Sequence, residues 1–401
     1  MKCKLSDICA FRKGKVDVSK LTLKTYISTE NMLPNKGGVT EASSLPTVQL
    51  TQEYKKGDIL VSNIRPYFKK IWQAKCDGGC SNDVLVFQGN SNIDGDFLYY
   101  ILANDDFFAY SMATSKGTKM PRGDKTSIMQ YEVPIFDIDT QRKIASVLRS
   151  LDEKIELNST INNNLEQQAQ ALFKSWFVDF EPFNGTMPSD WEIVPLEKIA
   201  DFQNGYAFKS KELLNEPSSD CYQVFKQGHI ARGGGFIPDG TKSWYPKRLA
   251  SKLEKFVLKK GDILMAMTDM KDNVAILGNT AIMPLDNEYI VNQRVGHLRA
   301  NGYKGVTYPF IYLLTNSTDF LVDLRSRANS GVQVNLSSSE IKASQTVLPS
   351  EEVNNAFSEI TLPMFEIIIN NQLENQRLAQ LRDTLLPKLM SGELDVSNIE
   401  L

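Results

Sequence analysis

The sequence predicts an α+β protein that consists of two copies of one unit, each a strand-rich domain followed by a long helix. Three observations support this fold class. Short motifs recur in the same order at an interval of about 200 residues. Short β-branched runs bounded by turn residues lie in the first part of each copy. A long apolar ladder with alternating steps of three and four then closes each copy.

The duplication rests on four ordered matches. Residues 5–10 (LSDICA) return as 196–200 (LEKIA), 55–60 (KKGDIL) as 259–264 (KKGDIL), 115–117 (SKG) as 329–331 (NSG), and 163–167 (NNLEQ) as 371–375 (NQLEN). Chance explains any one of these matches but hardly the ordered set. We therefore expect two diverged copies of one unit.

The first part of each copy is predicted to be an α+β domain, over residues 1–137 and 184–349. Strands are expected at 58–62, 83–87, 262–266 and 273–277, because these are β-branched runs that begin at Asp or Asn. A helix is expected after the strands of each copy, at 97–110 and at 308–326.

The second part of each copy is predicted to be a long helix, over residues 138–183 and 350–401. From Ile144 to Trp176 the ladder keeps a heptad pattern, and this length corresponds to about 48 Å of helix. Pro182 stops the first helix. In the second, Pro363 either kinks the helix or marks its true start, and Pro387 ends or kinks it.

Three asparagines interrupt the apolar ladders. Asn158 and Asn162 lie on the first ladder and Asn371 lies on the second. A buried asparagine between paired helices costs stability but selects one register, so these residues favour a specific helix pairing. The alternative is that the three side chains face solvent.

The composition is that of an ordinary globular chain. The 401 residues are 42% hydrophobic and 23% charged, and no run of eighteen apolar residues occurs. The five cysteines are few and odd in number, which is typical of reduced thiols and not of a disulfide framework. We expect a cytoplasmic protein with no membrane contact.

The sequence lacks the usual patterns of a catalytic centre. Neither His229 nor His297 belongs to a metal-ligand motif, and the glycines that follow Arg232 have no phosphate-loop context. Cys76 and Cys80 have a spacing seen in zinc sites but lack a second ligand pair, so buried or loop thiols are the competing interpretation. We expect no catalytic residue, no metal and no cofactor.

Several stretches spread over nearly the whole chain resemble one known family. They are 56–60 (KGDIL) with Arg65 and Pro66, 141–145 (QRKIA) leading to Leu151 and Asp152, 171–180 (ALFKSWFVDF), 188–196 (PSDWEIVPL) and 381–394 (LRDTLLPKLMSGEL). Together with the domain order, they resemble the specificity subunit of type I restriction-modification systems.

The resemblance implies two target recognition domains separated by two long antiparallel coiled-coil helices. It implies that each domain reads one half of a bipartite double-stranded DNA target and that the helices set the spacing. Two modification subunits would then methylate adenine, and restriction subunits would translocate and cleave the DNA. The competing interpretations are a DNA methyltransferase or nuclease with a degenerate catalytic domain, and a coiled-coil organiser without a DNA role.

The charge distribution agrees with DNA contact by the two domains. Lys and Arg against Asp and Glu number 18 against 15 in residues 1–137 and 19 against 17 in 184–349, but 5 against 7 and 3 against 9 in the helical segments. In the first domain the candidate DNA contacts are Arg65, Lys69, Lys70, Lys116, Lys119, Arg122 and Lys125. In the second they are Lys226, His229, Arg232, Lys242, Lys247, Arg248 and Gln333. For any single residue the alternative is an ordinary solvated charge.

The helix ends carry clusters of large apolar side chains. Phe173, Trp176, Phe177 and Phe180 lie near one end, and Leu385, Leu386 and Leu389 lie near the other. We expect these clusters to dock the modification subunits, because two paired helices do not cover so much apolar surface between them. The alternative is that they pack on the chain's own domains.

Overall fold

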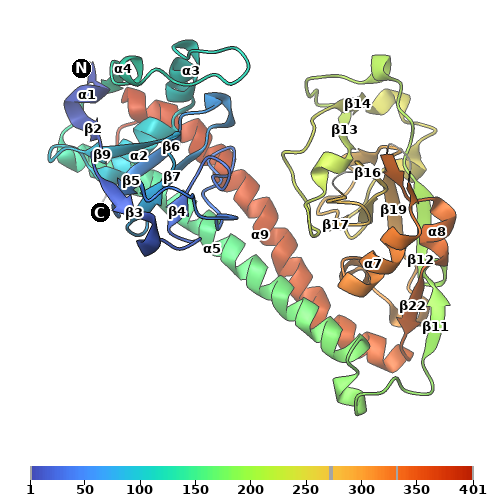
Figure 1. Ribbon diagram of the computed structural model, residues 1–401. Coiled ribbons are helices and arrows are strands. Elements are labelled where there is room, and N and C mark those ends of the chain that lie inside the picture. The colour runs from blue at the N-terminus through green and yellow to red at the C-terminus, as the bar shows by residue number, and fades with distance from the viewer. Residues whose placement is uncertain (1, 271–273, 331–332, 400–401) are drawn as a thin grey trace. The chain divides into compact units, whose positions relative to one another are not determined.

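The computed structural model describes residues 2–270, 274–330 and 333–399, and the side chains of Ser330 and Gln333 lie outside this description (Figure 1). The chain divides into two compact units. Unit 1 is Met1–Glu156 with Asn375–Leu401, and unit 2 is Leu157–Glu374. None of the described helices has an apolar stretch of the length that a bilayer span requires.

Unit 1 contains ten strands and four short helices among its described residues, together with one part of each long helix. They are β1 (Lys2–Lys4), α1 (Leu5–Ile8), β2 (Cys9–Phe11), β3 (Lys15–Asp17), β4 (Tyr26–Ile27), β5 (Leu50–Tyr54), β6 (Ile59–Ser62), β7 (Ile71–Gln73), β8 (Gly78–Cys80), β9 (Val84–Gly89), α2 (Gly95–Ala103), α3 (Asp105–Ala113), α4 (Lys125–Ile128) and β10 (Glu132–Pro134).

Unit 2 repeats this plan with additional strands. Its elements are β11 (Glu192–Pro195), β12 (Ala200–Asn204), β13 (Cys221–Phe225), β14 (Trp244–Pro246), β15 (Ile263–Ala266), β16 (Thr268–Met270), β17 (Thr280–Ile282), β18 (Tyr289–Val291), β19 (Val295–Ala300), α6 (Tyr308–Thr315), α7 (Thr318–Ser326), β20 (Asn329–Ser330), β21 (Gln333–Asn335), α8 (Ser338–Ala343) and β22 (Gln345–Leu348). The long helices α5 (Ile138–Phe177) and α9 (Glu351–Ser391) each contribute residues to both units.

The sheets show the duplication directly. In unit 1 the central sheet has the order β2-β9-β6-β7, and in unit 2 it has the order β12-β19-β15-β17. A two-stranded ribbon accompanies each central sheet, β1 with β10 in unit 1 and β11 with β22 in unit 2. The predicted fold class, two α+β domains with two long helices, is confirmed.

The central strand of each sheet is buried on both faces. Ile59 and Val61 of β6 pack with α2, α3 and the unit 1 parts of α5 and α9, whereas Leu60 packs toward the second sheet, β3-β5-β8-β4. In β15, Ile263 packs with helices and Leu264 packs on the opposite face. Side chains of a strand alternate between faces, so a continuous apolar run fits a strand covered on both sides.

The repeated KKGDIL motif forms the turn that starts each central strand. Gly57 and Gly261 have φ of +92° and +86°, which a residue with a side chain adopts only under strain. The following aspartate accepts a hydrogen bond from the backbone N of Lys55 in unit 1 (2.8 Å) and of Lys259 in unit 2 (2.7 Å). The motif is therefore a structural turn in both units.

The buried aspartate of each turn forms an ion pair with an arginine, and the arginine comes from a different position in each unit. Asp58 pairs with Arg12, whose Nη2 lies 2.9 Å from Oδ1, whereas Asp262 pairs with Arg299 of β19, whose Nε lies 2.6 Å from Oδ1. Burial opposes ionisation of Asp262, but bonds from His297 and Arg299 outweigh it and lower its pKa. Both units therefore contain the buried carboxylate, but the arginine that pairs with it lies at a different place in the chain.

Some expected elements differ from the observed ones. The helix expected at 97–110 is two helices, because Asn104 adopts an extended conformation and its side chain caps α3 by accepting from Asp106 N. The helix expected at 308–326 likewise divides into α6 and α7. The strand expected at 273–277 begins at Asn273, outside the described residues, and 274–277 are not a strand. There the backbone N–H groups of residues 275–277 donate to the Asp269 carboxylate.

Both prolines of the last helix are accommodated within it. Helix α9 continues through Pro363 and Pro387 to Ser391, so neither a start after Pro363 nor an end at Pro387 is correct. Pro363 lies on an exposed part of the helix, where water can solvate the carbonyl that has lost its amide partner.

The long helices pair antiparallel in each unit. In unit 1, Arg382 Nη1 lies 2.7 Å from Asp152 Oδ1. In unit 2, Asn158 donates to Glu374 (2.6 Å) and Asn371 donates to Asn162 Oδ1 (2.8 Å). The seam asparagines are therefore bonded across the helix pair, which supports their role in selecting its register.

Candidate nucleic-acid interface

Three loops of unit 1 meet at the C-terminal end of β6, and we call them the unit 1 edge: residues 33–38, 63–70 and 116–123. Ile64 pairs with Arg122 in an isolated bridge, and Arg65 N donates to Pro121 O (2.8 Å). The backbone N atoms of Asn35 and Lys36 donate to the carbonyls of Phe68 (2.8 Å) and Lys69 (2.9 Å). The structure thus brings the two predicted groups of the first domain together.

The backbone of the unit 1 edge is strained. Of the eight described non-glycine residues with positive φ, four lie here: Asn35 (55°), Lys36 (62°), Arg65 (50°) and Lys69 (50°). Each such residue costs about 1–3 kcal/mol and persists only where its surroundings hold it in place. Strain of this kind concentrates at functional sites, so it supports a binding role for these loops.

Two buried polar atoms at this edge lack a hydrogen-bond partner among the described residues. They are Asn63 Oδ1 and Arg65 Nε. A buried unpaired donor or acceptor carries a desolvation cost of about 1–3 kcal/mol. Such groups in a folded protein require an explanation, and a ligand that supplies the missing partners is one.

The other basic candidates of unit 1 differ in how their charge is used. Lys69 pairs with Asp105 (2.8 Å), Lys116 with Asp124 (2.6 Å) and Arg122 with Asp83 (3.1 Å). Lys70 donates to the Thr29 carbonyl (2.6 Å), and burial lowers its pKa. Lys119 is exposed in the hairpin loop.

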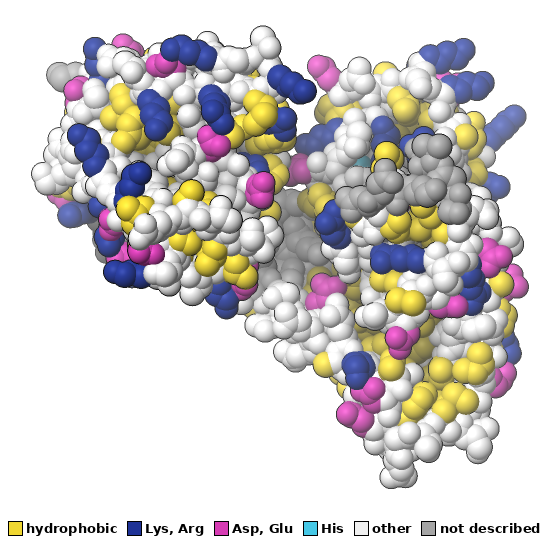
Figure 2. All heavy atoms as spheres, in the orientation of Figure 1, with side chains coloured by type: hydrophobic (Ala, Val, Ile, Leu, Met, Phe, Trp, Pro, Cys, Tyr) yellow, Lys and Arg dark blue, Asp and Glu magenta, His cyan; other side chains and the backbone are white. Residues whose placement is uncertain are grey.

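Lys125 begins α4 and lies over the Phe11 ring at 5.9 Å. Tyr67, Phe68 and Met120 are exposed at the same edge. Figure 2 shows Lys and Arg side chains set among hydrophobic ones on the face of unit 1 that is in view.

Unit 2 builds a corresponding edge at the C-terminal end of β15. Strand β16 pairs with β21, and β20 pairs with β21, as the 63–70 segment pairs with the 116–123 hairpin in unit 1. Residues 226–242 join this edge, because Gln227 Nε2 donates to Thr268 O (2.6 Å). We call β16, the β20–β21 hairpin and residues 226–242 the unit 2 edge.

The structure divides the basic candidates of unit 2 into two groups. Lys226, Arg232 and Lys242 belong to the unit 2 edge, where Arg232 and Lys242 are exposed and Lys242 pairs with Asp239 (3.1 Å). Lys247 and Arg248 lie beyond the opposite end of β14, where Lys247 N donates to Asp220 O. Gln333 begins β21, but its side chain lies outside the description.

His229 does not fit the expectation of a DNA contact. Its side chain is fully buried, stacks near Phe225 and Phe236, and accepts from Lys226 N through Nδ1 (3.1 Å). A base or phosphate cannot reach it in this conformation. The sequence did not predict this burial, because a single histidine has no neighbouring pattern that distinguishes a loop position from a core position.

Sequence reasoning missed Asp269 and Met270. The Asp269 carboxylate accepts three backbone N–H bonds from residues 275–277, at 2.7 to 3.2 Å. Met270 is 59% exposed at the edge. The match of residues 329–331 to 115–117 was a signal for this edge, since it aligns the β20–β21 hairpin with the hairpin of unit 1.

The predicted docking aromatics belong to the core of unit 2. Phe173 and Phe177 are buried, and Phe177 contacts Phe310 and Phe357 with ring centroids at 5.1 and 4.8 Å. Trp176 and Phe180 are partly buried and pack on the same core. Phe173 and Phe177 are therefore covered by the chain's own domain and are not available to a partner, whereas docking by Trp176 and Phe180 stays a prediction.

The leucines near the other helix end are also core residues. Leu386 and Leu389 are buried in the core of unit 1, and Leu385 packs against it. Leu386 and Leu389 are therefore not available to a partner, whereas docking by Leu385 stays a prediction. A large apolar side chain near a helix end is covered by its own domain when that domain lies beside the helix.

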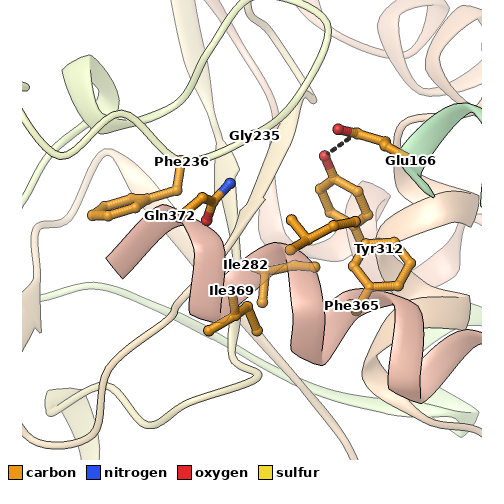
Figure 3. Close-up of a pocket in the computed structure, with 9 residues that line it drawn as sticks. Glu166, Gly235, Phe236, Ile282, Tyr312, Phe365, Ile369 and Gln372 are labelled. Atoms are coloured by element: carbon orange, nitrogen blue, oxygen red, sulfur yellow. Dashed lines mark hydrogen bonds between the residues drawn. The ribbon is translucent and has the colours of Figure 1, made fainter. Parts of the chain in front are cut away.

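A small pocket lies within unit 2 (Figure 3). Its lining is mostly apolar, with Phe236, Ile282, Phe365 and Ile369 among the residues, and Tyr312 donates to Glu166 across it (2.7 Å). Burial raises the pKa of Tyr312 well above its usual value, so this pair is a structural hydrogen bond.

The search for a metal site covers the residues that the structure describes. Across the described ranges, no three His, Cys, Asp or Glu side chains gather closely enough to hold an ion. Cys76 is exposed, whereas Cys80 is buried in β8, where burial raises the pKa of its thiol to about 12. The two thiols therefore differ in surroundings, as buried and loop cysteines do.

Known proteins are similar to this chain in sequence and in fold. Residues 1–167 and 188–382 match the type I restriction modification DNA specificity domain. The type I restriction enzyme HindI specificity subunit of Haemophilus influenzae is 27% identical over 97% of this chain and 98% of its own length. The MjaIX specificity subunit of Methanocaldococcus jannaschii is 26% identical over 79% of this chain and 74% of its own.

A solved structure supports the same conclusion for the fold. The crystal structure of the type I restriction-modification S subunit from M. genitalium superposes with a TM-score of 0.60 at 18% identity, over 97% of this chain and 96% of that one. The chain belongs to the family of type I restriction-modification DNA specificity subunits.

Proposed function

We propose that the chain reads a bipartite double-stranded DNA target, with the unit 1 edge on one half-site and the unit 2 edge on the other. Members of this family are non-catalytic subunits that give a restriction-modification complex its DNA sequence specificity. The observation that carries the proposal is the repetition of one edge at the ends of β6 and β15. Two equivalent edges in one chain suit two separately read half-sites.

The edges suit the two kinds of contact that DNA recognition needs. Phosphates are held by Lys and Arg that reach solvent. We assign this role to the exposed Lys116, Lys119, Arg122 and Lys125 in unit 1, and to the exposed Arg232 and Lys242 and the half-buried Lys226 in unit 2. Bases are read by side chains held in fixed positions, and Arg65 fits this role because its backbone is constrained and its Nε is unpaired.

The partners follow from the family. Type I specificity subunits work in complexes with DNA and with the other subunits of the system. We propose that two modification subunits methylate adenine at the half-sites and that restriction subunits translocate and cleave the DNA. We further propose that the long helices set the spacing of the half-sites and that the complex works in the cytoplasm, where its DNA substrate lies.

The buried residues at the helix ends cannot form the docking site of the modification subunits, so another surface is needed. Phe177 and Leu386 are not available for a partner, but Leu157 and Ile161 on α5 are 54% and 36% exposed. They lie four residues apart and therefore on one face of the helix. We propose that this exposed apolar face contacts a modification subunit.

The test begins with the target. Adenine-methylation sequencing of the host identifies the motif, and the assembled complex is then titrated with a duplex that carries it. Replacing Lys119 and Arg122 by Ala in unit 1, or Arg232 and Lys242 by Ala in unit 2, should weaken binding. The slope of log K against log salt should fall by about 0.9 for each phosphate that the variant no longer neutralises.

Matched controls lie in the same units but away from the edges. Lys56 belongs to the turn before β6, and Arg248 lies beyond the far end of β14. Their alanine variants should bind like the original complex. An unchanged affinity and salt slope in both edge variants would contradict the proposed interface.

A further inference from the structure

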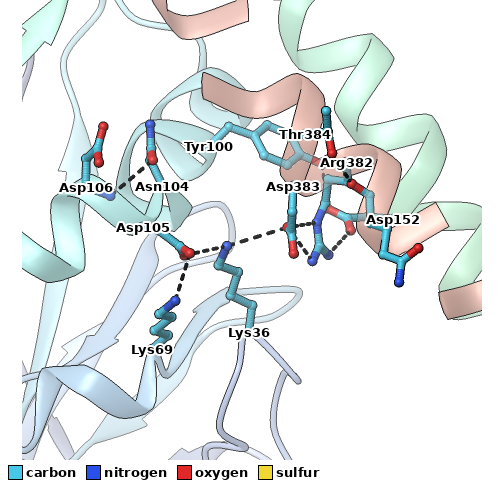
Figure 4. A network of polar contacts seen from close by, with 11 residues as sticks. Lys36, Lys69, Tyr100, Asn104, Asp105, Asp106, Asp152, Arg382, Asp383 and Thr384 are labelled. Carbon is cyan, nitrogen blue, oxygen red and sulfur yellow. Dashed lines mark hydrogen bonds and ion pairs between the residues drawn. The ribbon is translucent and has the colours of Figure 1, made fainter. Parts of the chain in front are cut away.

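Lys36 is a buried cation at the unit 1 edge. Its side chain is only 8% exposed, and its Nζ lies 3.1 Å from Asp105 Oδ1 and 3.7 Å from Asp383 Oδ1. Lysine is rarely buried unless it is paired with an acid. The two carboxylates come from α3 and α9, so one loop lysine joins elements that are distant in the sequence (Figure 4).

The loop of Lys36 supports the loop that follows β6. Lys36 N donates to Lys69 O (2.9 Å), and Asn35 N donates to Phe68 O (2.8 Å). Lys69 Nζ also pairs with Asp105 (2.8 Å), so Asp105 receives both lysines. A movement of Lys36 would therefore move the 65–70 segment, in which Arg65 lies.

The network continues into the helix pair of unit 1. Asp383 is paired with its neighbour Arg382 (2.9 Å), and Arg382 pairs with Asp152 of α5 (2.7 Å). Tyr100 of α2 donates to the other Asp152 oxygen (2.8 Å). Three acids and three bases, all from unit 1, thus alternate from the edge loops to α5.

Burial separates Lys36 from the phosphate-binding candidates. Lys119 is exposed, whereas Lys36 is enclosed and already paired with two carboxylates. A phosphate oxygen cannot reach the Lys36 ammonium without displacing Asp105 or Asp383. The role of Lys36 is therefore to hold the loops and not to bind DNA.

We infer that Lys36 is a positioning residue for base reading by unit 1, which fixes the 33–38 and 65–70 loops to Asp105 and to Asp383 of the C-terminal helix. This inference rests on the proposed function of the unit 1 edge. Its consequence is that recognition of one half-site depends on a residue of α9, far outside the first domain in sequence.

The test uses the assembled complex and the duplex with the methylated motif. Lys36→Met keeps the apolar stem and removes the charge, and Asp383→Asn keeps the shape and removes the charge. For each variant, affinity is measured for the motif and for duplexes with one base pair changed in either half-site. In each variant, the affinity ratio between the motif and a duplex changed in the unit 1 half-site should fall about tenfold, which is the effect of one mismatched base pair. The same ratio for the other half-site should not change.

Three further results separate positioning from other roles. The double variant should lose no more discrimination than Lys36→Met alone, because Lys36→Met already removes the ion pair with Asp383. The salt slope should stay unchanged, since every phosphate-binding side chain is still present. Lys24→Met, which removes an exposed lysine paired with Glu41, and Asp395→Asn should behave like the original chain.

The outcomes that overturn the inference are distinct from failure of the proposed function. A salt slope lowered by about 0.9 in Lys36→Met would make Lys36 a phosphate contact. Unchanged discrimination, or equal loss at both half-sites, would also overturn it. If Lys36→Met does not fold, Asp383→Asn decides the same question. If the original complex bound the motif and the altered duplexes of both half-sites with equal affinity, that result would instead contradict the proposed function.

Discussion

His229 lies in an aromatic cluster of unit 2, with ring centroids 5.1 Å from Phe225 and 6.0 Å from Tyr289. Burial lowers the pKa of His229 below its usual value, because the charged imidazolium is poorly solvated there. The folded chain therefore holds the neutral form, and the unfolded chain takes up a proton near pH 6.5. Stability from this residue is present above that pH and is lost as the pH falls below it.

We expect the free energy of unfolding of the chain to decrease by about 1 kcal/mol from about pH 7.5 to about pH 5.5 through His229. Urea unfolding at both pH values measures this. The His229→Gln variant should be less stable at the higher pH, since it loses ring packing, but should show a smaller decrease with pH. An equal decrease in both proteins would exclude His229 as its source.

Arg65 combines a strained backbone with a buried unpaired Nε. If it reads a guanine, Arg65→Ala should cost about 1–3 kcal/mol in binding and relax selectivity at one position of the unit 1 half-site. Arg65→Lys should lose the same selectivity, because lysine lacks the two-pronged geometry. Titrations with duplexes that vary each base pair measure this.

A matched control for Arg65 is Lys125→Ala, which should weaken binding to all sequences alike. An Arg65→Ala variant that weakens every duplex equally would assign Arg65 to the phosphates instead.

At the scale of elements, the end of α5 is part of the unit 2 core. Phe177→Ala should lower the free energy of unfolding by about 3–5 kcal/mol, because a buried ring is replaced by a cavity. Val178→Ala, at an exposed neighbouring position, should change it by less than about 0.5 kcal/mol. Denaturant unfolding of the free chain measures both. A stable Phe177→Ala chain that no longer assembles would restore the docking role for this cluster.

The exposed face of α5 gives the corresponding prediction for assembly. Changing Leu157 and Ile161 to Ser should reduce co-purification with the modification subunit at least about tenfold while leaving the unfolding midpoint nearly unchanged. Gln170→Ser is the control: Gln170 is exposed on another face of the same helix, so this variant should assemble normally. Normal assembly of the double variant would place the partner elsewhere.

At the scale of the whole molecule, unit 1 includes the C-terminal segment. Leu386, Leu389 and Val396 are buried in the same core as Phe97, and Asp383 pairs with Lys36. We therefore expect a swap of residues 1–156 together with 375–401 from a relative to change one half of the methylated motif and leave the other intact. Methylation sequencing of cells that carry the swapped chain measures this.

A swap of residues 1–137 alone should give a less stable chain, because it joins a foreign domain to the native α9 core residues at a cost of about 1–3 kcal/mol. Thermal unfolding of the two chimaeras compares them. A complete swap that altered both half-sites would contradict separate reading by the two units.

Local signals in the sequence were sufficient for the architecture. The repeated motifs and heptad ladders predicted two α+β domains and two long helices, and the KKGDIL turn occurs in both units because glycine and aspartate favour it through nearest neighbours alone. The family resemblance rested on the same short stretches. These features depend on residues close together in the chain, which a sequence displays directly.

Only the tertiary structure decided which side chains are available. Phe177 and Leu386 were predicted as docking residues and are buried, His229 was predicted at the DNA and lies in a core, and Lys36 was overlooked. Burial and pairing depend on residues far away in the chain, as when Asp383 meets Lys36. A charged or apolar residue type states what a side chain prefers, but its neighbours in space determine whether solvent, DNA or a partner can reach it.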